Sequence, residues 1–226
     1  MPEFLPAPGH VTVIVIDPAL IPEESTTACL SAAEQDQAAR FHFEKDARHW
    51  RACRTALRRI LGAALELDPA YLSFHLGTHG KPLLPPPRHG LHFNLSHCRD
   101  LALVALCQTG PVGIDLEPAD RAPTLIGCES AFCHPDEIAR FPTSSEERAA
   151  RLLDLWTSKE SLLKALGTGL SLSPESVSLA TGNASDHPLL RDFTIHRLDH
   201  PLLRDHIAHL AAPQEILRIG IFEFPG

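Results

Sequence analysis

The chain has 226 residues, of which 44% are hydrophobic and 21% charged, so it is long and apolar enough to bury a sizeable core and is not a disordered polypeptide. Its formal net charge of −8 argues against a general nucleic-acid-binding protein, and any anionic ligand needs a local basic cluster. The first ten residues lack the pattern of a signal peptide, and the apolar run at 11–16 is too short to cross a bilayer. We therefore expect a soluble cytoplasmic protein that does not contact membranes.

The six cysteines form no CxxC pair, and Cys53 and Cys107 lie at apolar positions of predicted elements. We interpret them as reduced, mostly buried thiols of a cytosolic protein. Cys128, Cys133 and His134 form one loose cluster without a second pair of ligands. Such a cluster is a weak indication of zinc, and we favour a structural role for it.

The β-branched residues at 11–17 predict a first strand. Ser31 and Glu34 fit a capping box that begins a helix reaching to about residue 40, and apolar residues at helical spacing predict a longer helix at 45–64. The other face of this longer helix carries the densest basic cluster of the chain, at Arg48, Arg51, Arg54, Arg58 and Arg59. A row of arginines is usually a solvated face, but in an acidic chain it is also a candidate anion or phosphate surface.

Strands are expected at 72–76, 91–95 and 101–107, joined by turns rich in glycine and proline. In the first of these turns, Gly80 and Pro82 would stiffen the backbone around Lys81, which is either a simple loop lysine or a presented cation. At 93–97, Phe-Asn-Leu-Ser-His, a strand gives way to a polar turn. Ser96 and His97 could cap that turn or form hydrogen bonds with a phosphate.

The next predicted strand, at 112–117, places Asp115 and Glu117 on one face, opposite three aliphatic side chains. The two carboxylates repel each other, and no basic residue lies beside them before Arg121. A solvated sheet edge would suffice to neutralise them, but a divalent cation is the sharper explanation. Mg²⁺ binds carboxylate oxygens and is commonly shared with substrate phosphates.

Residues 121–141 are expected to be irregular, with a short helical piece near 136–140, and a loop of this length is often a lid or a docking surface. Ser144 and Glu147 fit a capping box for a helix that Gly167 and Gly169 end. Within this helix, three residues four apart project along one side: Trp156, Glu160 and Lys164.

By themselves, Glu160 and Lys164 would be a surface ion pair worth about 0.2–0.5 kcal/mol. Together with Asp115 and Glu117 they offer three carboxylates that can meet at one cation, a pattern that indicates metal-assisted phosphoryl-type transfer. Further short strands are expected at 176–180, 193–198, 207–211 and 216–224. Each half then has a strand, helices and several strands, which predicts an α+β fold with subdomains at 1–109 and 110–226.

Four segments resemble motifs of the Sfp-type 4′-phosphopantetheinyl transferases, in the order of that family: GKP at 80–82, FNLSH at 93–97, GIDLE at 113–117 and WTSKESLLKALGTGL at 156–170. The resemblance fades before residue 40 and after residue 171. It implies a monomer of two similar α+β subdomains in a pseudo-twofold arrangement, with coenzyme A bound in the cleft between them. In such enzymes the serine hydroxyl of an apo acyl or peptidyl carrier protein attacks the β-phosphorus of coenzyme A, and 3′,5′-ADP leaves.

Carried over to this chain, the resemblance implies that Mg²⁺ is held by Asp115, Glu117 and Glu160. Glu160, or a metal-bound water that it orients, would be the base for the serine hydroxyl, and Lys164 would neutralise the pyrophosphate and assist the leaving group. Coenzyme A contacts are implied for Lys81, Pro82, Ser96, His97, Lys159 and Lys164, with Arg48 or Arg54 at the 3′-phosphate. The chain departs from the family at Cys98, where a small hydroxyl residue is frequent, and at His49, where a more basic residue is common.

Two other classes of function remain as alternatives. A coenzyme A or nucleotide-binding module without turnover would not need both Glu160 and Lys164, and the dense metal motifs of a Mg²⁺-dependent phosphohydrolase are missing from the sequence. A Walker loop is missing as well, because the glycines at 167 and 169 are not followed by Gly-Lys-Ser/Thr. Carrier proteins are usually acidic around their serine, so the arginine-bearing helix or an apolar groove near 127–141 is the expected docking surface. Which carrier is modified does not follow from the sequence.

Overall fold

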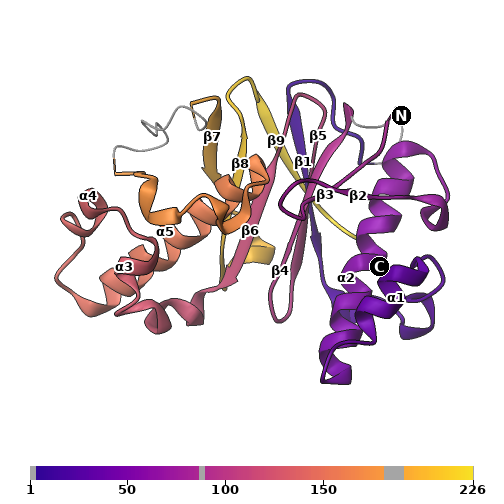
Figure 1. The fold of residues 1–226 in the computed structure, drawn as a ribbon, viewed down its shortest axis with the longest axis horizontal. Helices are drawn as coiled ribbons and strands as arrows, with labels where there is room; N and C mark the ends of the chain where they lie inside the picture. Colours follow the sequence, from indigo (N-terminus) through magenta and orange to yellow (C-terminus); the bar gives the residue numbers. More distant parts are fainter. Residues whose placement is uncertain (1–3, 87–89, 181–190, 226) are drawn as a thin grey trace.

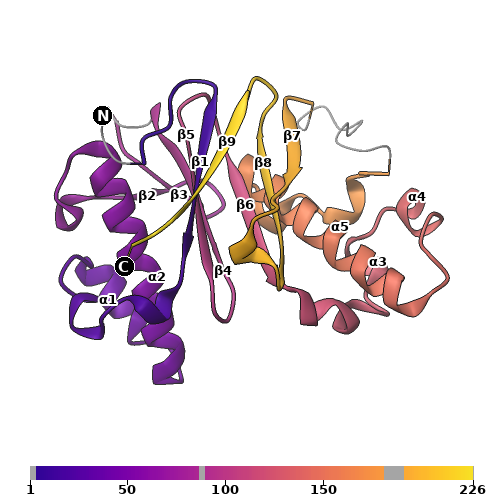
Figure 2. The same ribbon diagram turned by 180° about the vertical axis from the view of Figure 1, so that it is seen from behind.

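The computed structural model describes residues 4–86, 90–180 and 191–225. Two β-sheets lie side by side between two long helices, so the layers are α2 (Glu44–Leu65), a four-stranded sheet, a three-stranded sheet and α5 (Ser145–Leu166) (Figure 1). The same order of layers is seen from behind (Figure 2). The expected α+β fold with two subdomains is confirmed. In the described part of the chain, no helix is long and apolar enough to cross a membrane.

Both sheets follow one plan. The four-stranded sheet has the order β4-β5-β1-β9, with strands at His10–Ile16 (β1), His92–His97 (β4), Ala102–Cys107 (β5) and Arg218–Glu223 (β9). The three-stranded sheet has the order β6-β8-β7, with strands at Gly113–Pro118 (β6), Phe193–Arg197 (β7) and His206–Pro213 (β8). Apart from β9, each sheet is built from a strand, a long helix and two more strands, the last of which lies between the other two.

The last strand crosses between the two sheets. β9 pairs with β1 in parallel, whereas the other strand pairs are antiparallel. A division of the chain at residues 109 and 110 assigns β9 to the second subdomain, although it completes the sheet of the first. That division stays a prediction, and β9 belongs to the first sheet in space.

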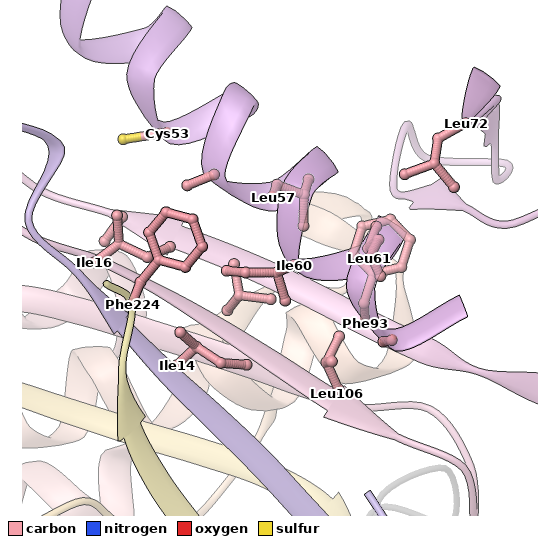
Figure 3. Close-up of a cluster of buried hydrophobic side chains, with 14 of the residues drawn as sticks. Ile14, Ile16, Cys53, Leu57, Ile60, Leu61, Leu72, Phe93, Leu106 and Phe224 are labelled. Atoms are coloured by element: carbon pink, nitrogen blue, oxygen red, sulfur yellow. The ribbon is translucent and has the colours of Figure 1, made fainter. Parts of the chain in front are cut away.

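The alternation of side chains along β1 explains why the layers stack. Ile14 and Ile16 face α2 and pack with Leu57 and Ile60 in a buried cluster (Figure 3). Val11, Val13 and Val15 point to the opposite side and pack against aliphatic side chains of β6 and β8, including Ile114, Leu116 and Leu210. A third cluster lies between α5 and the outer face of the three-stranded sheet. Because β1 is buried on both faces, it reads as a continuous apolar run rather than an alternating one.

The smaller elements connect these layers. They are the helices Ala32–Ala38 (α1), Glu129–Phe132 (α3) and Pro135–Ile138 (α4), the hairpin of His75–Leu76 (β2) with Pro82–Leu83 (β3), and several short 3-10 turns such as Pro18–Leu20 and Ala119–Leu125. Ser31 and Glu34 form the predicted reciprocal capping box at the start of α1. Ser144 accepts a hydrogen bond from the Glu147 amide at the start of α5, and Gly167, with φ of 70°, ends that helix.

Two expected strands differ from the structure. The strand predicted at 72–76 is reduced to His75–Leu76. The region 176–180 forms no strand, and its first residue ends the 3-10 turn Pro174–Ser176. The amide of Leu179 donates to the carboxylate of Glu137 at 2.7 Å, so it is not available to a strand partner.

Candidate functional site

A pocket of about 270 Å³ lies where β4, β6 and α5 meet. Seven of its nine lining residues are polar or aromatic side chains singled out in the sequence: Ser96, His97, Asp115, Glu117, Trp156, Glu160 and Lys164. The structure therefore brings together residues from three elements that are up to 68 positions apart in the chain, as for the hydrogen bond between Ser96 and Lys164.

Gly113 allows β6 to approach α5 closely enough to build this pocket. A Cβ atom at this position would lie 2.1 Å from the carbonyl oxygen of Ser161 and 2.2 Å from the amide nitrogen of Ala165. Both atoms belong to the helix backbone, so neither can move aside like a flexible side chain. The close contact sets Asp115, two residues further along the strand, beside the face of α5 that carries Glu160 and Lys164.

Side chains of β4 also bind the backbone of β6. Asn94 accepts a hydrogen bond from the amide of Ile114 at 2.8 Å, and Ser96 accepts one from the amide of Leu116 at 3.2 Å. The two sheets are thus joined at this edge by side chains rather than by a strand ladder. This junction fixes Ser96 next to the carboxylates of β6.

Asp115 is the most tightly held acid of the pocket. Its Oδ1 atom accepts from Lys164 Nζ at 2.5 Å and from Ser96 Oγ at 3.1 Å. Its Oδ2 atom is buried and has no hydrogen-bond partner among the described residues. A buried carboxylate oxygen without a partner is costly, so its presence marks a position where a ligand would be stabilising.

The other two acids have raised pKa values. Burial raises the pKa of Glu160, and the charges of Asp115 and Glu117 raise it further, while Lys164 opposes the shift. Burial and the charge of Asp115 also raise the pKa of Glu117, which pairs with Arg121. Arg121 in turn lies over the ring of Trp156, at 5.7 Å from its centroid. The sequence analysis noted Arg121 only as the first basic residue after the two acids, and its spacing of four from Glu117 is the signal that could have predicted this ion pair.

This set of groups suits a hard divalent cation in its chemistry. All the candidate ligands are carboxylate oxygens, one of them is buried without a partner, and the mutual repulsion of the acids would be relieved by positive charge. The ligand atoms are not gathered into one tight group, however, since Lys164 and Arg121 pair with Asp115 and Glu117. Among the described residues, ligand atoms within 4.8 Å of one another occur in two other groups: His49, Cys53 and His97, and Cys98, Asp100 and His206.

A larger cavity of about 1060 Å³ adjoins the pocket at His97, which lines both. Its walls come from α2, including Arg48 and His49, from the turn after β4 and from the residues that lead into β8. The rings of His49 and His97 lie 5.3 Å apart. Burial lowers the pKa of both imidazoles, and His49 and Lys164 lower that of His97 further. The sequence marked His49 only as a departure from a pattern, whereas the structure places it in the cavity wall.

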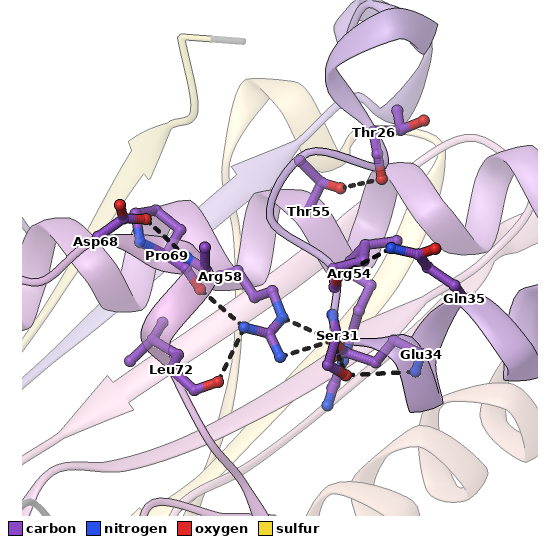
Figure 4. A network of polar contacts seen from close by, with 12 residues as sticks. Thr26, Ser31, Glu34, Gln35, Arg54, Thr55, Arg58, Asp68, Pro69 and Leu72 are labelled. Carbon is purple, nitrogen blue, oxygen red and sulfur yellow. Dashed lines mark hydrogen bonds and ion pairs between the residues drawn. The ribbon is translucent and has the colours of Figure 1, made fainter.

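The arginines of α2 are distributed differently from the predicted solvated or anion-binding row. Arg54 and Arg58 both bind the carboxylate of Glu34, and Arg58, which is 1% exposed, also donates to the carbonyl oxygens of Pro69 and Leu72 (Figure 4). Arg54 therefore forms an ion pair that joins α2 to α1. Arg48 is half exposed, lies 3.6 Å from Glu23 and lines the larger cavity.

Besides Arg54, three residues predicted to contact coenzyme A lie outside both cavities. Lys81 Nζ donates to the carbonyl oxygens of Val112, Lys164 and Ala165 at 2.9, 2.6 and 3.1 Å, and burial lowers its pKa to about 8. It thus binds the carboxyl end of α5, where a cation is favourable. Pro82 begins β3 and pairs with Leu76. Lys159 is 1% exposed and is enclosed by Glu137 and two backbone carbonyls.

Comparison with known proteins gives matches over most of the chain. The family described as "4′-phosphopantetheinyl transferase superfamily" matches residues 111–211, and the family described as "4′-phosphopantetheinyl transferase, N-terminal" matches residues 21–109. The 4′-phosphopantetheinyl transferase HetI of Nostoc sp. is 34% identical over 180 residues, which cover 74% of this chain and 76% of the relative.

Two Bacillus subtilis proteins are also similar. A 4′-phosphopantetheinyl transferase is 31% identical over 158 residues, covering 70% of this chain and 69% of the relative. The 4′-phosphopantetheinyl transferase Sfp of strain 168 is 27% identical over 150 residues, covering 66% of each.

Proposed function

The chain belongs to the 4′-phosphopantetheinyl transferase superfamily, and from this premise we propose that it transfers 4′-phosphopantetheine from coenzyme A to a serine of an apo acyl or peptidyl carrier protein, in a Mg²⁺-dependent reaction that releases 3′,5′-ADP. The observation that carries the proposal is the pocket that joins Asp115, Glu117, Glu160 and Lys164 beside a cavity large enough for a nucleotide.

Asp115, Glu117 and Glu160 are the proposed Mg²⁺ ligands. When bound, Mg²⁺ neutralises charge on the transferred phosphoryl group and its leaving group. The chain supplies only oxygen donors here, including the unpartnered Oδ2 of Asp115. This donor set is the one that Mg²⁺ prefers, and it would bind a thiophilic metal poorly.

Glu160, or a metal-bound water that it orients, is the proposed base for the serine hydroxyl of the carrier. Its raised pKa makes its carboxylate a better proton acceptor than an ordinary glutamate at neutral pH. Lys164 stands one helical turn away and donates to Asp115 and Ser96. In the complex, its ammonium group would donate to the pyrophosphate oxygens and hold them against the developing negative charge.

We place the nucleotide portion of coenzyme A in the larger cavity. His97 lines both cavities and Ser96 lines the pocket, so both can donate to phosphate oxygens near the reacting centre. Arg48 and His49 line the nucleotide side and are the proposed partners of the 3′-phosphate. For Lys81, Pro82, Arg54 and Lys159 we propose roles in holding the site together, because their contacts are with the protein.

The surroundings of the site suggest how the carrier docks. We propose that it approaches over the larger cavity, whose wall includes the exposed Arg48, and over α3 and α4, which belong to the predicted docking loop. We further propose a monomer with units at 1–109 and 110–226, in which β9 of the second unit completes the sheet of the first. We propose that it binds neither nucleic acids nor membranes. A charge reversal at Arg48 that leaves the KM for the carrier unchanged contradicts an electrostatic dock.

The experiment that tests the function is intact-mass measurement of an apo peptidyl carrier domain after incubation with the protein, Mg²⁺ and coenzyme A. The expected result is a gain of one phosphopantetheine that disappears with EDTA and with Glu160→Gln. Glu146→Gln, which changes an exposed glutamate in the first turn of the same helix, is the matched control and should retain activity. Hydrolysis of coenzyme A without a carrier adduct would instead identify a phosphohydrolase, and binding without either product a coenzyme A-binding module.

A further inference from the structure

A second group of potential metal ligands lies in the wall of the larger cavity, outside the carboxylate pocket. Cys98 and Asp100 come from the turn between β4 and β5, and His206 is the first residue of β8. The thiol, one carboxylate oxygen and one ring nitrogen all lie within 4.8 Å of one another. The group thus joins a turn of the first sheet to a strand of the second.

The distances within this group, which are those of hydrogen bonds, are also compatible with a metal site. Cys98 Sγ lies 3.5 Å from Asp100 Oδ1, and His206 Nε2 lies 3.0 Å from the same oxygen. Ligands at about 2.0–2.3 Å from a tetrahedral metal are separated by about 3.3–3.6 Å. Two of the three separations are therefore within about half an ångström of the coordinated geometry, so an ion can be accommodated by small side-chain movements.

The ligand types select the metal. A thiolate and an imidazole are donors that Mg²⁺ and Ca²⁺ avoid, whereas Zn²⁺ and similar borderline divalent ions bind them together with a carboxylate. We propose that Cys98, Asp100 and His206 form a Zn²⁺-type transition-metal site that is separate from the carboxylate pocket. These three side chains leave one position of a four-coordinate metal free, and because the site lies in the wall of an open cavity, water can fill it.

Two protons must move before a metal can bind, one on the Cys98 thiol and one on the His206 ring. At present Cys98 Sγ–H and His206 Nε2–H both donate to Asp100 Oδ1. On binding, the thiol releases its proton to solvent, and the ring changes tautomer, so that its proton moves from Nε2 to Nδ1 and Nε2 is free to bind the metal. Nδ1 is buried and has no hydrogen-bond partner among the residues that the structure describes, so it takes up the proton without losing a bond of its own, while the two hydrogen bonds to Asp100 are replaced by bonds to the metal. The ring is 6% exposed, and its packing already holds Nε2 toward Asp100.

The neighbouring group of His49, Cys53 and His97 is a weaker competitor. Cys53 is 1% exposed in the core beneath α2, whereas Cys98 is partly exposed. Burial raises the pKa of both thiols, that of Cys53 to about 12. Ionisation of Cys53 would place a charge inside an apolar cluster, so we assign the metal to Cys98 and its partners.

The test uses the full chain after removal of metals, with Co²⁺ and Zn²⁺ alone as probes. Titration with Co²⁺ should produce the near-ultraviolet thiolate-to-cobalt absorption at one equivalent, and Zn²⁺ should abolish it. Calorimetry with Zn²⁺ should give the same stoichiometry. Because the site joins the two sheets, Zn²⁺ should also raise the unfolding temperature.

Variants distinguish this site from its competitors. Cys98→Ser and His206→Gln should lose the thiolate-to-cobalt absorption, and Asp100→Asn, which changes an exposed turn residue, should weaken binding at least tenfold without affecting folding. Cys53→Ala and Cys128→Ala are matched controls that should bind Co²⁺ as the native chain does. Absence of the absorption in the native chain, its persistence in Cys98→Ser or its loss in Cys53→Ala would overturn the proposal. Asp115→Asn should bind Zn²⁺ normally, so this result is independent of whether the transferase proposal holds.

Discussion

Helix α5 carries two lysine–carboxylate pairs that differ in how completely they are satisfied. Lys159 Nζ donates to Glu137 at 2.7 Å and to the carbonyl oxygens of Phe132 and Pro174 at 2.7 and 3.0 Å, which uses all three of its protons. Glu137 accepts two further bonds, from the amides of His134 and Leu179. This pair is buried and closed to any ligand.

Lys164, five residues further along, pairs with Asp115 at 2.5 Å but is 29% exposed in a pocket. One oxygen of Asp115 has no partner in the described part of the chain, and a third carboxylate, Glu160, lines the same pocket. Both pairs have the same chemistry. The pair at Lys159 has only a structural role because all its hydrogen-bonding atoms are used within the protein. The pair at Lys164 can bind a ligand because an oxygen of Asp115 has no partner among the described residues and the pair lines a pocket.

The largest effect is expected where the unsatisfied pair is changed. Asp115→Asn keeps the shape of the side chain but removes a proposed Mg²⁺ ligand and the partner of Lys164. Turnover should fall by about 10²–10³-fold, the cost of removing one preorganised charge-stabilising group. The rate of holo-carrier formation by intact mass measures it, with thermal unfolding as the control for folding. Full activity in Asp115→Asn would show that this acid holds no metal.

Changing the closed pair should have the opposite signature. Lys159→Met leaves the Glu137 carboxylate buried without a cation, so the free energy of unfolding should fall by about 3–5 kcal/mol. Turnover per folded molecule should be unchanged below the melting temperature, because Lys159 lies outside both cavities. Urea denaturation measures the loss of stability.

The matched control is Lys159→Met combined with Glu137→Gln, which removes the buried charge but keeps an acceptor for only one of the amides of His134 and Leu179, because they bond different oxygens of Glu137. This double variant should recover part of the stability. If Lys159→Met instead lost turnover at full stability, Lys159 would contact the ligand, as the family resemblance implied.

This comparison also shows what could be predicted from the sequence. Helical spacing placed Glu160 and Lys164 on one side of α5, and strand alternation placed Asp115 and Glu117 on one face of β6, because both relations are local and periodic. The α+β element order followed from the same periodicities. Prediction of the pocket then required only the contact between α5 and β6, and Gly113 is the residue that allows this contact.

The contacts that could not be predicted from the sequence are those of basic residues whose partners are distant in the chain. Lys81 binds carbonyl oxygens 83 and 84 positions away, and Arg54 binds Glu34 20 positions away. The long side chain of a lysine or an arginine can bind a phosphate or a backbone carbonyl equally well. Every residue has a backbone carbonyl, so the sequence does not indicate which one will be bound. The parallel pairing of β9 with β1 was not foreseen for a similar reason, since strand patterns do not specify which edge a strand joins.

An intermediate effect is expected from pH. Burial lowers the pKa of His49 and of His97, so both rings are largely neutral near pH 7 when no anion is bound. An anion between them favours their protonated forms and raises both pKa values in the complex. The affinity for 3′,5′-ADP should therefore rise as the pH falls from about 8 to about 6, by roughly three- to tenfold.

Calorimetric titration with 3′,5′-ADP at several pH values measures this effect. His97→Gln is the comparison variant, because it removes one of the two imidazoles while the titration of the phosphate itself is unchanged. The difference between the two profiles should isolate the contribution of the ring. Identical profiles would mean that the nucleotide phosphate lies elsewhere than between His49 and His97.

The smallest effect is expected at a third ion pair of α5, which lies on the surface. Arg151 is 48% exposed and meets Asp154 at 2.8 Å, and Asp154 keeps a second partner in Arg197 at 2.6 Å. Arg151→Ala should change the free energy of unfolding by at most about 1 kcal/mol, since water replaces the lost contact and Arg197 remains. Urea denaturation beside Lys159→Met gives the measurement. A loss as large as that of Lys159→Met would mean that burial does not set the energetic difference between ion pairs on this helix, and that Asp154 is held by Arg151 for a structural reason of its own.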